Sequence, residues 1–440
     1  MVDLRLMAVT AMAAGMLAGA AIAADPNGDE LWAGAAARIE RHRKADATVV
    51  VLDAAGRPVP DAAIRVEQTR HAFLFGCNIF LWGHLPDDRL EQAYRGRFAE
   101  LLNYATLPFY WWMYEPAPGK TIAEHDRAVA AWCQKQGIAT KGHPLMWNYA
   151  EPAWLPAAPE EVHRLQLARV EDCATRFRGL IDRWDVVNEA TQFDREECAK
   201  QAPKLTATWK QYGQAAMPRE CFLAARRGNP AAVLVINDYR TDPAYARLIE
   251  QLVAAGGKRV YDVIGIQSHM HASVWPNRQI WEVCERFARF GVPLHFTETT
   301  ILSGNRVWDQ PRGSPWPSTP EGEAFQAREV ERFYTMLFSH PAVEAITWWD
   351  FSDRGAWKAA PAGLVRKDMT PKPAYDALKR LVKGAWWSTA QVRSGPDGTV
   401  GFRGFLGEYR LTVRAGGKPA VVAAATLAKD KPNRWTVKIE

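Results

Sequence analysis

Two glutamates, Glu189 and Glu298, each come near the end of a short run of aromatic and β-branched residues. The first run begins at Trp184 and the second at Phe296. Such runs are typical of buried strands, so each glutamate is predicted at the C-terminal tip of a strand. In a closed parallel barrel these tips lie on one face, around one pocket. Two carboxylates facing one pocket are the groups that glycoside hydrolysis requires.

The two carboxyl groups are predicted to have different roles. Glu189 is expected to be the general acid, held protonated near neutral pH by burial or by the second carboxylate, and later the base that activates water. Glu298 is expected to stay ionised and to attack the sugar ring as the nucleophile. Asn188, beside the acid, is expected to hydrogen-bond the 2-hydroxyl of the reacting sugar. The alternative is that strand-end glutamates only cap helices or bind arginine. This alternative is weaker for two glutamates at the tips of two strands than for either one alone.

An eightfold alternation of strands and helices would bring these glutamates together. The strand candidates are residues 72–77, 104–110, 139–147, 183–189, 231–239, 263–270, 293–300 and 343–351. Between them, for example at 90–103, 162–177 and 323–338, apolar residues recur at the spacing of amphipathic helices. The pattern predicts an α/β fold, a (β/α)8 TIM barrel over residues 71–384. The alternative is an open doubly wound sheet, but no glycine-rich phosphate loop follows the first strand.

The two flanks of the barrel have a different character. Residues 24–70 include a predicted β-hairpin, with strands at 48–52 and 63–66. Residues 385–440 contain short alternating runs at 399–402, 408–413, 419–424 and 434–439. Because an isolated two-stranded hairpin is marginally stable, both flanks are expected to join in one small accessory unit resembling a β-sandwich. Its role is either that of a structural clamp or that of a sugar-binding unit.

The composition is that of an ordinary folded protein with an excess of tryptophan. Hydrophobic residues make up 48% and charged residues 24% of the 440 residues, so disorder is not indicated. The 19 tryptophans supply flat apolar area that suits both core packing and stacking on sugar faces. The net charge of +6 comes without a dense Lys/Arg block or a nucleic-acid motif, so no nucleic-acid partner is expected.

The N-terminus has the features of a targeting segment. A short apolar stretch precedes Ala21-Ile22-Ala23, so residues 1–23 are expected to be a cleaved signal peptide. No other segment reaches the ~20 uninterrupted apolar residues of a spanning helix, so no membrane contact is expected after cleavage. The mature protein is expected to be a secreted or periplasmic monomer. In that oxidising compartment Cys198 and Cys221, which bracket a polar insertion, are the candidate disulfide among six cysteines.

Further polar and aromatic groups stand at other strand tips. The third strand ends in His143 to Asn148, the sixth in Gln267 to His271, and the eighth in Trp349 to Asp353, followed by Trp357. His269 and His271 could form half of a metal site, but no third ligand stands at a recognisable offset, so no metal is expected. His269 is instead expected to hydrogen-bond Glu298 and to orient it.

These segments together resemble glycoside hydrolase family 10, the endo-β-1,4-xylanases, over about residues 73–381. The matching segments are Gly142-His143 to Trp147, Asp185-Val186-Val187-Asn188-Glu189, Asn237-Asp238-Tyr239, Ile264 to His269, Thr297-Glu298, Trp349 to Trp357, and Pro371 to Tyr375. The resemblance implies a barrel, retention of anomeric configuration, no cofactor, and a cleft for a polysaccharide or oligosaccharide. It also implies that Tyr239 lies on the leaving-group side. The residues it places around the reacting sugar are His143, Trp147, Gln267, His269, Trp349 and Trp357.

The chain departs from the family pattern at three places. The usual Asn-Glu-x-Lys tetrad of the second strand corresponds here to Leu107, Pro108, Phe109 and Tyr110. The usual Trp-His becomes Trp147-Asn148, and the usual Glu-x-Asp becomes Glu298-Thr299-Thr300. We therefore expect an intact catalytic core with a rebuilt distal glycone subsite, in which Tyr110 and Asn148 contact the substrate.

The function predicted from these features is that of a secreted retaining hydrolase that cleaves internal β-1,4-xylosidic bonds of xylan or its fragments by double displacement. One alternative is a related barrel hydrolase that acts on another β-linked plant glycan. Another is a carbohydrate-binding pseudoenzyme that keeps the cleft without turnover. Asn188, Glu189 and Glu298 together favour an enzyme, because binding alone needs no matched acid and nucleophile.

Overall fold

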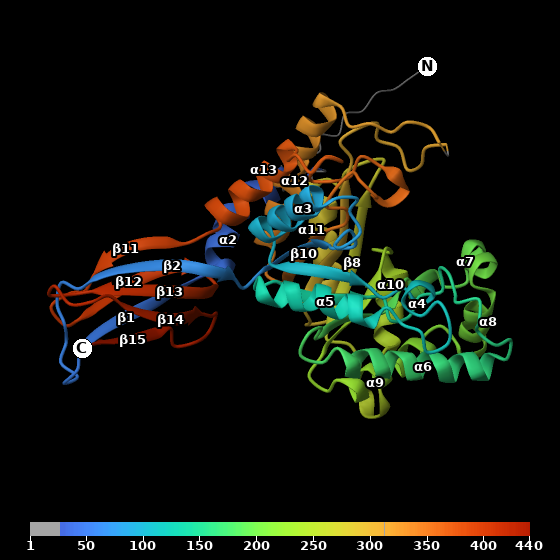
Figure 1. Ribbon diagram of the computed structural model, residues 1–440, viewed down its shortest axis with the longest axis horizontal. Coiled ribbons are helices and arrows are strands. Elements are labelled where there is room, and N and C mark those ends of the chain that lie inside the picture. The colour runs from blue at the N-terminus through green and yellow to red at the C-terminus, as the bar shows by residue number, and fades with distance from the viewer. Residues whose placement is uncertain (1–26, 312) are drawn as a thin grey trace, which may run out of the picture.

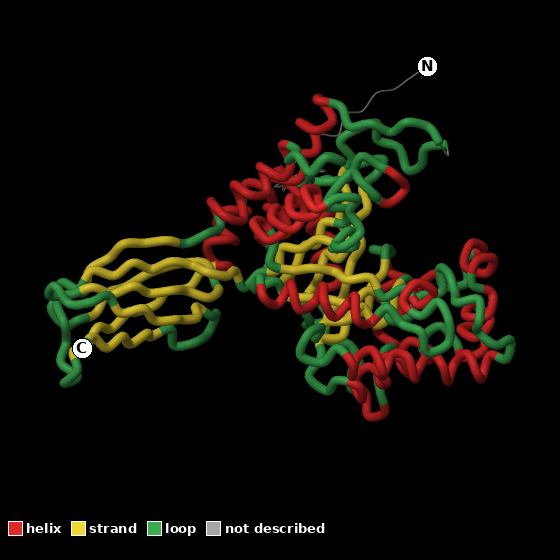
Figure 2. Tube along the Cα trace, viewed as in Figure 1, coloured by secondary structure: helices red, strands yellow, loops and turns green. Residues whose placement is uncertain are grey.

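The computed structural model describes residues 27–311 and 313–440 (Figure 1). The predicted signal peptide, residues 1–23, lies outside the described residues. Two units are visible: a barrel surrounded by helices, and an elongated pair of sheets that projects from one end of the barrel (Figures 1 and 2). Among the described residues, no helix combines the length and the apolar character needed to cross a membrane.

Eight parallel strands close into the barrel in the order β10-β3-β4-β5-β6-β7-β8-β9. Their bounds are β3 (Leu74–Asn78), β4 (Tyr104–Pro108), β5 (Ala139–His143), β6 (Arg183–Asn188), β7 (Val233–Asp238), β8 (Val263–Met270), β9 (Leu294–Ile301) and β10 (Val343–Trp348). Each falls on one of the eight predicted strands, so the predicted (β/α)8 fold is confirmed. At one place the close approach of two strands requires glycine, since a Cβ on Gly142 of β5 would lie 2.1 Å from the ring of Trp184 on β6.

Helices connect consecutive strands and cover the outside of the barrel. The main ones are α3 (Asp88–Leu101), α5 (Ala123–Lys135), α6 (Pro159–Arg176), α9 (Ala216–Gly228), α10 (Pro243–Gln251), α11 (Asn277–Ala288), α12 (Pro320–Ser339) and α13 (Pro373–Arg380). Several begin at capped positions: the side chain of Asp87 accepts from the backbone N–H of Leu90, and that of Thr319 from Gly322. Short helices enlarge the loops at the strand tips, namely α4 (Trp111–Tyr114) after β4, and α7 (Glu196–Gln201) and α8 (Pro203–Tyr212) after β6.

The two flanks form a β-sandwich. One sheet has the order β12-β1-β15 and the other β11-β2-β13-β14. The strands are β1 (Lys44–Asp53), β2 (Ala63–His71), β11 (Thr389–Arg393), β12 (Thr399–Phe405), β13 (Gly407–Arg414), β14 (Val421–Leu427) and β15 (Arg434–Ile439). Strands from both ends of the chain pair within each sheet, as expected of a joint accessory unit.

The predicted hairpin over 48–66 is wrong, because β1 and β2 lie in opposite sheets. β1 pairs with β12 and β15, whereas β2 pairs with β11 and β13. Val49 and Val51 of β1 share one buried core with Ile64 and Val66 of β2. In the sandwich the apolar rows of β1 and β2 face each other, so both are buried. If the two strands were neighbours in a single exposed sheet, these rows would remain in contact with water.

The candidate disulfide is also wrong. All six cysteines are buried free thiols. Cys198 belongs to α7, whereas Cys221 belongs to α9 and places its Sγ 3.3 Å from the Sδ of Met146. These thiols are therefore packing groups in two different parts of the core.

A helix and an aromatic stack join the sandwich to the barrel. In α2 (Ala35–Arg43), Arg43 is buried and donates to the backbone oxygens of Phe338, His340 and Val343 at 2.5 to 2.8 Å. The ring of Phe338 stacks on Trp386, with centroids 4.2 Å apart. These contacts fix the sandwich at the N-terminal end of the barrel strands.

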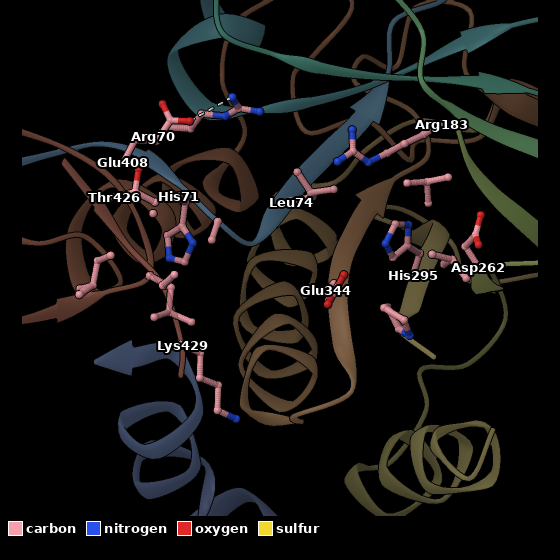
Figure 3. Close-up of a pocket in the computed structure, with 18 residues that line it drawn as sticks. Arg70, His71, Leu74, Arg183, Asp262, His295, Glu344, Glu408, Thr426 and Lys429 are labelled. Carbon is pink, nitrogen blue, oxygen red and sulfur yellow. Dashed lines mark hydrogen bonds and ion pairs between the residues drawn. The ribbon is translucent and has the colours of Figure 1, made fainter. Parts of the chain in front are cut away.

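A cavity of about 560 Å³ lies at this junction (Figure 3). The barrel contributes residues near the starts of strands, including Leu74, Arg183 and His295, and the sandwich contributes Arg70 and Glu408. Because strand starts line it, the cavity lies at the end of the barrel opposite Glu189 and Glu298. It is separate from the site that the sequence predicts.

Candidate active site

Glu298 lies on β9 within the mouth of the barrel and is only 4% exposed. Its Oε1 accepts a hydrogen bond from Nδ2 of Asn237 at 2.8 Å, and its Oε2 lies 3.1 Å from Nε2 of His269. Burial alone would raise the pKa of Glu298, but the hydrogen bond to His269 and the positive charges of His143, His269 and Lys141 outweigh it and lower the pKa. The site therefore holds Glu298 as an ionised carboxylate.

Glu189 follows the last residue of β6 and turns sharply into the same mouth. Its backbone has φ 58°, a left-handed conformation that a residue with a side chain adopts only when its surroundings hold it. The backbone N–H of Glu189 donates to the carbonyl oxygen of Asn237 at 2.8 Å, which fixes this turn. The carboxylate accepts from Trp147 Nε1 at 3.2 Å and from Gln267 Nε2 at 3.2 Å.

Arg195 forms an ion pair with Glu189 that the sequence analysis did not anticipate. Its Nη2 lies 2.5 Å from Oε2 of Glu189. Burial would lower the pKa of Arg195, but the charge of Glu189 and its other acidic neighbours raise it. The partner expected to keep Glu189 protonated was the second carboxylate, whereas the contact in the structure is with a cation. Arg195 was missed because it lies six residues along the chain, in a loop whose course no pattern predicts.

A chain of amides connects the two glutamates. Asn237 Nδ2 donates both to Glu298 Oε1 and to Oδ1 of Asn188, each at 2.8 Å. Asn188 in turn donates to Glu189 Oε1 at 3.3 Å. The side-chain carbonyl of Asn237 accepts from the hydroxyl of Thr297 at 2.5 Å, so its amide is directed at Glu298. The strand tips of β6, β7 and β9 thus hold both carboxylates in one network.

Beneath the site, a buried ionic row extends down the inside of the barrel. Lys141 Nζ lies 2.6 Å and His143 Nδ1 lies 2.7 Å from the same oxygen of Asp185, and Lys141 and Asp185 are fully buried. Burial would raise the pKa of Asp185, but Lys141 and His143 lower it below its usual range. The other ring nitrogen of His143 lies 3.9 Å from Glu298 Oε1. The row therefore orients His143 toward Glu298, the predicted nucleophile.

Aromatic rings form the walls of the mouth. On the side of β4 and β5, Tyr110 lies 5.6 Å from His143 and 5.1 Å from Trp112 between ring centroids, and Trp147 stacks on Tyr149 at 4.6 Å. On the side of β10, the ring of Trp349 lies 5.3 Å from that of His143. Flat rings around buried carboxylates form a surface on which sugar rings can stack.

A third group of rings surrounds His271. The ring of Trp357 lies 4.7 Å from His269 and 5.2 Å from His271, and that of Trp308 lies 5.3 Å from His271. Burial, with smaller contributions from His269 and Lys358, lowers the pKa of His271 to about 3. His271 is therefore neutral and aromatic in character at neutral pH. Within residues 27–311 and 313–440, no three His, Cys, Asp or Glu side chains are grouped as metal ligands.

The structure places nearly all of the predicted site residues around the mouth. Tyr239, at the tip of β7, donates its hydroxyl to Gln192 and lies with its ring 5.8 Å from the guanidinium of Arg195, next to Glu189. Asn148 is placed elsewhere: it is buried, and its amide donates to Phe193 O at 2.6 Å and Thr206 Oγ1 at 2.8 Å. It anchors the loop after β6 and does not face the carboxylates.

Comparisons with known proteins agree with this geometry. Residues 109–381 match the family model described as Glycosyl hydrolase family 10. The chain is 26% identical over 389 residues to the anti-sigma-I factor RsgI6 of Acetivibrio thermocellus, covering 87% of this chain and 46% of that protein. It is 26% identical over 325 residues to endo-1,4-beta-xylanase C of Paenibacillus barcinonensis, covering 64% of this chain and 29% of that protein. The chain thus spans less than half the length of these two relatives.

Solved structures show the same fold. Xylanase 10B of Thermotoga petrophila RKU-1, in complex with xylobiose, superposes with a TM-score of 0.58 at 23% identity, over 71% of this chain and 95% of that chain. Because the family model matches more than half of the residues, and because the barrel places Glu189 and Glu298 together, the chain belongs to glycosyl hydrolase family 10.

Proposed function

We propose that this chain is a retaining glycoside hydrolase that cleaves internal β-1,4-xylosidic bonds of xylan or xylan fragments. The observation that carries the proposal is the buried, ionised Glu298, held by Asn237 and His269 within the same amide network as Glu189. The family match supports a glycoside hydrolase, and several relatives are named endo-1,4-beta-xylanases. No cofactor is needed, since two carboxyl groups suffice for this chemistry.

The reaction proceeds in two displacements. In the first, an oxygen of Glu298 forms a bond to the anomeric carbon while the bond to the leaving oxygen breaks. The leaving-group oxygen takes the proton of Glu189. In the second, Glu189 takes a proton from water, the water oxygen bonds to the anomeric carbon, and the ester bond to Glu298 breaks. The two inversions leave the sugar with its original configuration.

The neighbouring side chains suit these steps. His269 and Asn237 hold the two carboxylate oxygens of Glu298 in place, so the carboxylate needs little reorganisation when one of them attacks. Asn188 and Gln267 lie between the two carboxylates, where they reach the hydroxyls of the reacting sugar. Trp349, Trp147 and Tyr110 supply faces for sugar stacking.

A second candidate function, binding of the glycan without turnover, is favoured by the ion pair between Arg195 and Glu189. A carboxylate paired with a guanidinium is stabilised in its ionised form, whereas an acid catalyst must carry a proton. A hydrolase on another β-linked glycan is favoured by the aromatic Tyr110, which stands where the family resemblance implies a lysine, and by its neighbour Trp112.

One experiment distinguishes these three candidate functions. Purified protein is incubated separately with linear xylan, glucuronoxylan, arabinoxylan and mixed-linkage β-glucan, and the sizes of the products are measured. Short xylo-oligosaccharides from a xylan support the proposal, products from β-glucan alone support the other hydrolase, and affinity without products supports the binding protein. Proton NMR of the first products should show the β-anomer. Initial release of the α-anomer would rule out the retaining mechanism. Glu298→Ala protein is the control for contaminating activity.

We also propose that the protein is exported and acts as a monomer on extracellular or periplasmic polysaccharide. The apolar stretch before Ala21-Ile22-Ala23 supports export. N-terminal sequencing of exported protein should find Ala24 or Asp25 as the first residue. An intact Met1 on exported protein would remove this argument.

A further inference from the structure

Asp350 is a buried carboxyl group that the steps above do not use. It follows β10 by two residues and is 6% exposed. Its Oδ1 accepts a hydrogen bond from the backbone N–H of Trp357 at 3.1 Å. Its Oδ2 is buried and has no hydrogen-bond partner among the described residues. A buried polar atom without a partner is costly, so its presence calls for a ligand or a functional reason.

The groups that act on Asp350 are those of the catalytic mouth. His269 comes from β8, Glu298 from β9, and Asp353 from the same loop. The charge of Asp350 also acts on Cys77 at the end of β3 and on Tyr110 at the tip of β4. Burial, with smaller contributions from Asp353 and Glu298, raises the pKa of Asp350 to about 7, although the hydrogen bond from Trp357 and the charge of His269 oppose this.

The barrel order gives the side of the site on which Asp350 lies. β10 stands diametrically opposite β6, and β3 stands opposite β7. Glu189 follows β6, and Arg195 and Tyr239 lie beside it, so that side holds the leaving group in the proposed reaction. Asp350 therefore lies on the other, glycone side of the scissile bond, together with Phe80, whose ring lies 5.6 Å from Trp349 and 6.0 Å from Tyr110.

We propose that Asp350 is a specificity-determining residue whose free Oδ2 accepts a hydrogen bond from a hydroxyl of the sugar on the glycone side. The inference rests on the proposed function of the same site. The ligand is a neutral sugar, because a uronate here would bring a third negative charge beside Glu298 and Asp350. The aromatic faces of Phe80, Tyr110 and Trp349 cover the sugar, while Asp350 accepts a hydrogen bond from one of its hydroxyls.

The test measures xylobiose binding by tryptophan fluorescence in the Glu298→Ala background, which needs no turnover. Adding Asp350→Ala should weaken binding about tenfold or more, as expected for loss of a buried, charge-assisted hydrogen bond. Asp350→Asn keeps the acceptor for Trp357 N–H but places an amide nitrogen, which cannot accept, where Oδ2 stands, so it should weaken binding to a similar extent. With Asp350 present, xylobiose should bind more tightly as the pH rises and Asp350 loses its proton, and Asp350→Asn should remove this dependence. Asp368→Asn, at an exposed loop, is the matched control and should leave both quantities unchanged.

Two results would overturn the inference. One is an Asp350→Ala variant that binds xylobiose within twofold of its parent. The other is an Asp350→Asn variant with the same pH dependence as its parent, which would reduce Asp350 to a support for the Trp357 loop. Failure of the proposed hydrolysis is a separate result, namely wild-type protein that binds xylobiose but does not cleave 4-nitrophenyl β-xylobioside. The melting temperature of each variant shows whether it is folded.

Discussion

Arg195 Nη2 and Glu189 Oε2 lie 2.5 Å apart, so the predicted proton donor is paired with a cation. Arg195 reaches it from the loop between β6 and α7, and its guanidinium also lies 5.8 Å from the ring of Tyr239. For Glu189 to protonate a leaving group, this pair must loosen when substrate binds. Whether this ion pair opens when substrate binds therefore distinguishes a catalytic cleft from one that only binds sugar.

Removing Arg195 should speed the step in which Glu189 acts on the leaving group. Arg195→Met removes the ion pair that must open before that step, so kcat on an unactivated xylo-oligosaccharide should rise about fivefold, the equivalent of ~1 kcal/mol for an ion pair. Arg195→Lys keeps a positive charge and should leave kcat near its original value. The control substrate is an aryl glycoside with a good leaving group, on which kcat should change little. Equal kcat values for wild type and Arg195→Met on the oligosaccharide would show that the pair does not limit the acid.

The two glutamates should respond differently to truncation. Glu298→Ala should abolish turnover of all substrates, because no glycosyl-enzyme intermediate can form. Glu189→Ala should spare the first step on aryl glycosides with good leaving groups, which need little protonation, and should lose activity on xylan. Pre-steady-state release of the aryl group measures that first step. Near-normal xylan turnover by Glu298→Ala would refute the role assignment.

The aromatic wall at β4 should set the preference among glycone sugars. The charged residues of the family pattern would hold a sugar through charge-assisted hydrogen bonds of roughly 1.5 to 3 kcal/mol each, whereas the aromatic contacts that replace them contribute about 0.5 to 1.5 kcal/mol. An unsubstituted sugar is therefore held more weakly here, and side groups on the sugar must supply the remaining contacts. Tyr110→Ala and Trp112→Ala should therefore lower kcat/KM on substituted oligosaccharides more than on linear ones of equal backbone length. Trp32→Ala, in α1 (Asp29–Ala33) away from the site, serves as the control. If linear substrates are preferred and neither variant changes the ratio, the subsite has not been rebuilt.

Asp126 should make stability depend on pH. It is fully buried in α5, neither oxygen has a hydrogen-bond partner among the described residues, and burial raises its pKa to about 8. Between about pH 4 and 8 the unfolded chain has lost this proton while the folded protein keeps it, so stability falls as pH rises. Relative to Asp126→Asn, wild type should lose on the order of 1 kcal/mol of unfolding free energy per pH unit there.

Urea denaturation at several pH values measures this difference. The control is Asp430→Asn, at an exposed position in the sandwich, which should follow wild type throughout. Parallel stability curves for wild type and Asp126→Asn between pH 4 and 8 would show that Asp126 is ionised in the folded protein.

The amino-acid sequence by itself determined the barrel and its two glutamates. Alternating strand and helix patterns are local properties, and parallel closure then places every strand tip on one face. This is why Glu189 and Glu298, more than a hundred residues apart, could be assigned to one site before any contact was known. The contact between His269 and Glu298 was predicted for the same reason, since both stand at neighbouring tips.

Tertiary structure alone decided the contacts that loops and long-range pairing create. Arg195 and Asn148 both lie in loops, and no periodicity predicts that one reaches Glu189 while the other binds Phe193 and Thr206. The strands at 44–53 and 63–71 look like a hairpin because they are close in sequence, yet each finds its partners beyond residue 388. Local patterns specify which segments become strands, whereas burial of both apolar faces, a property of the whole chain, decides which strands pair.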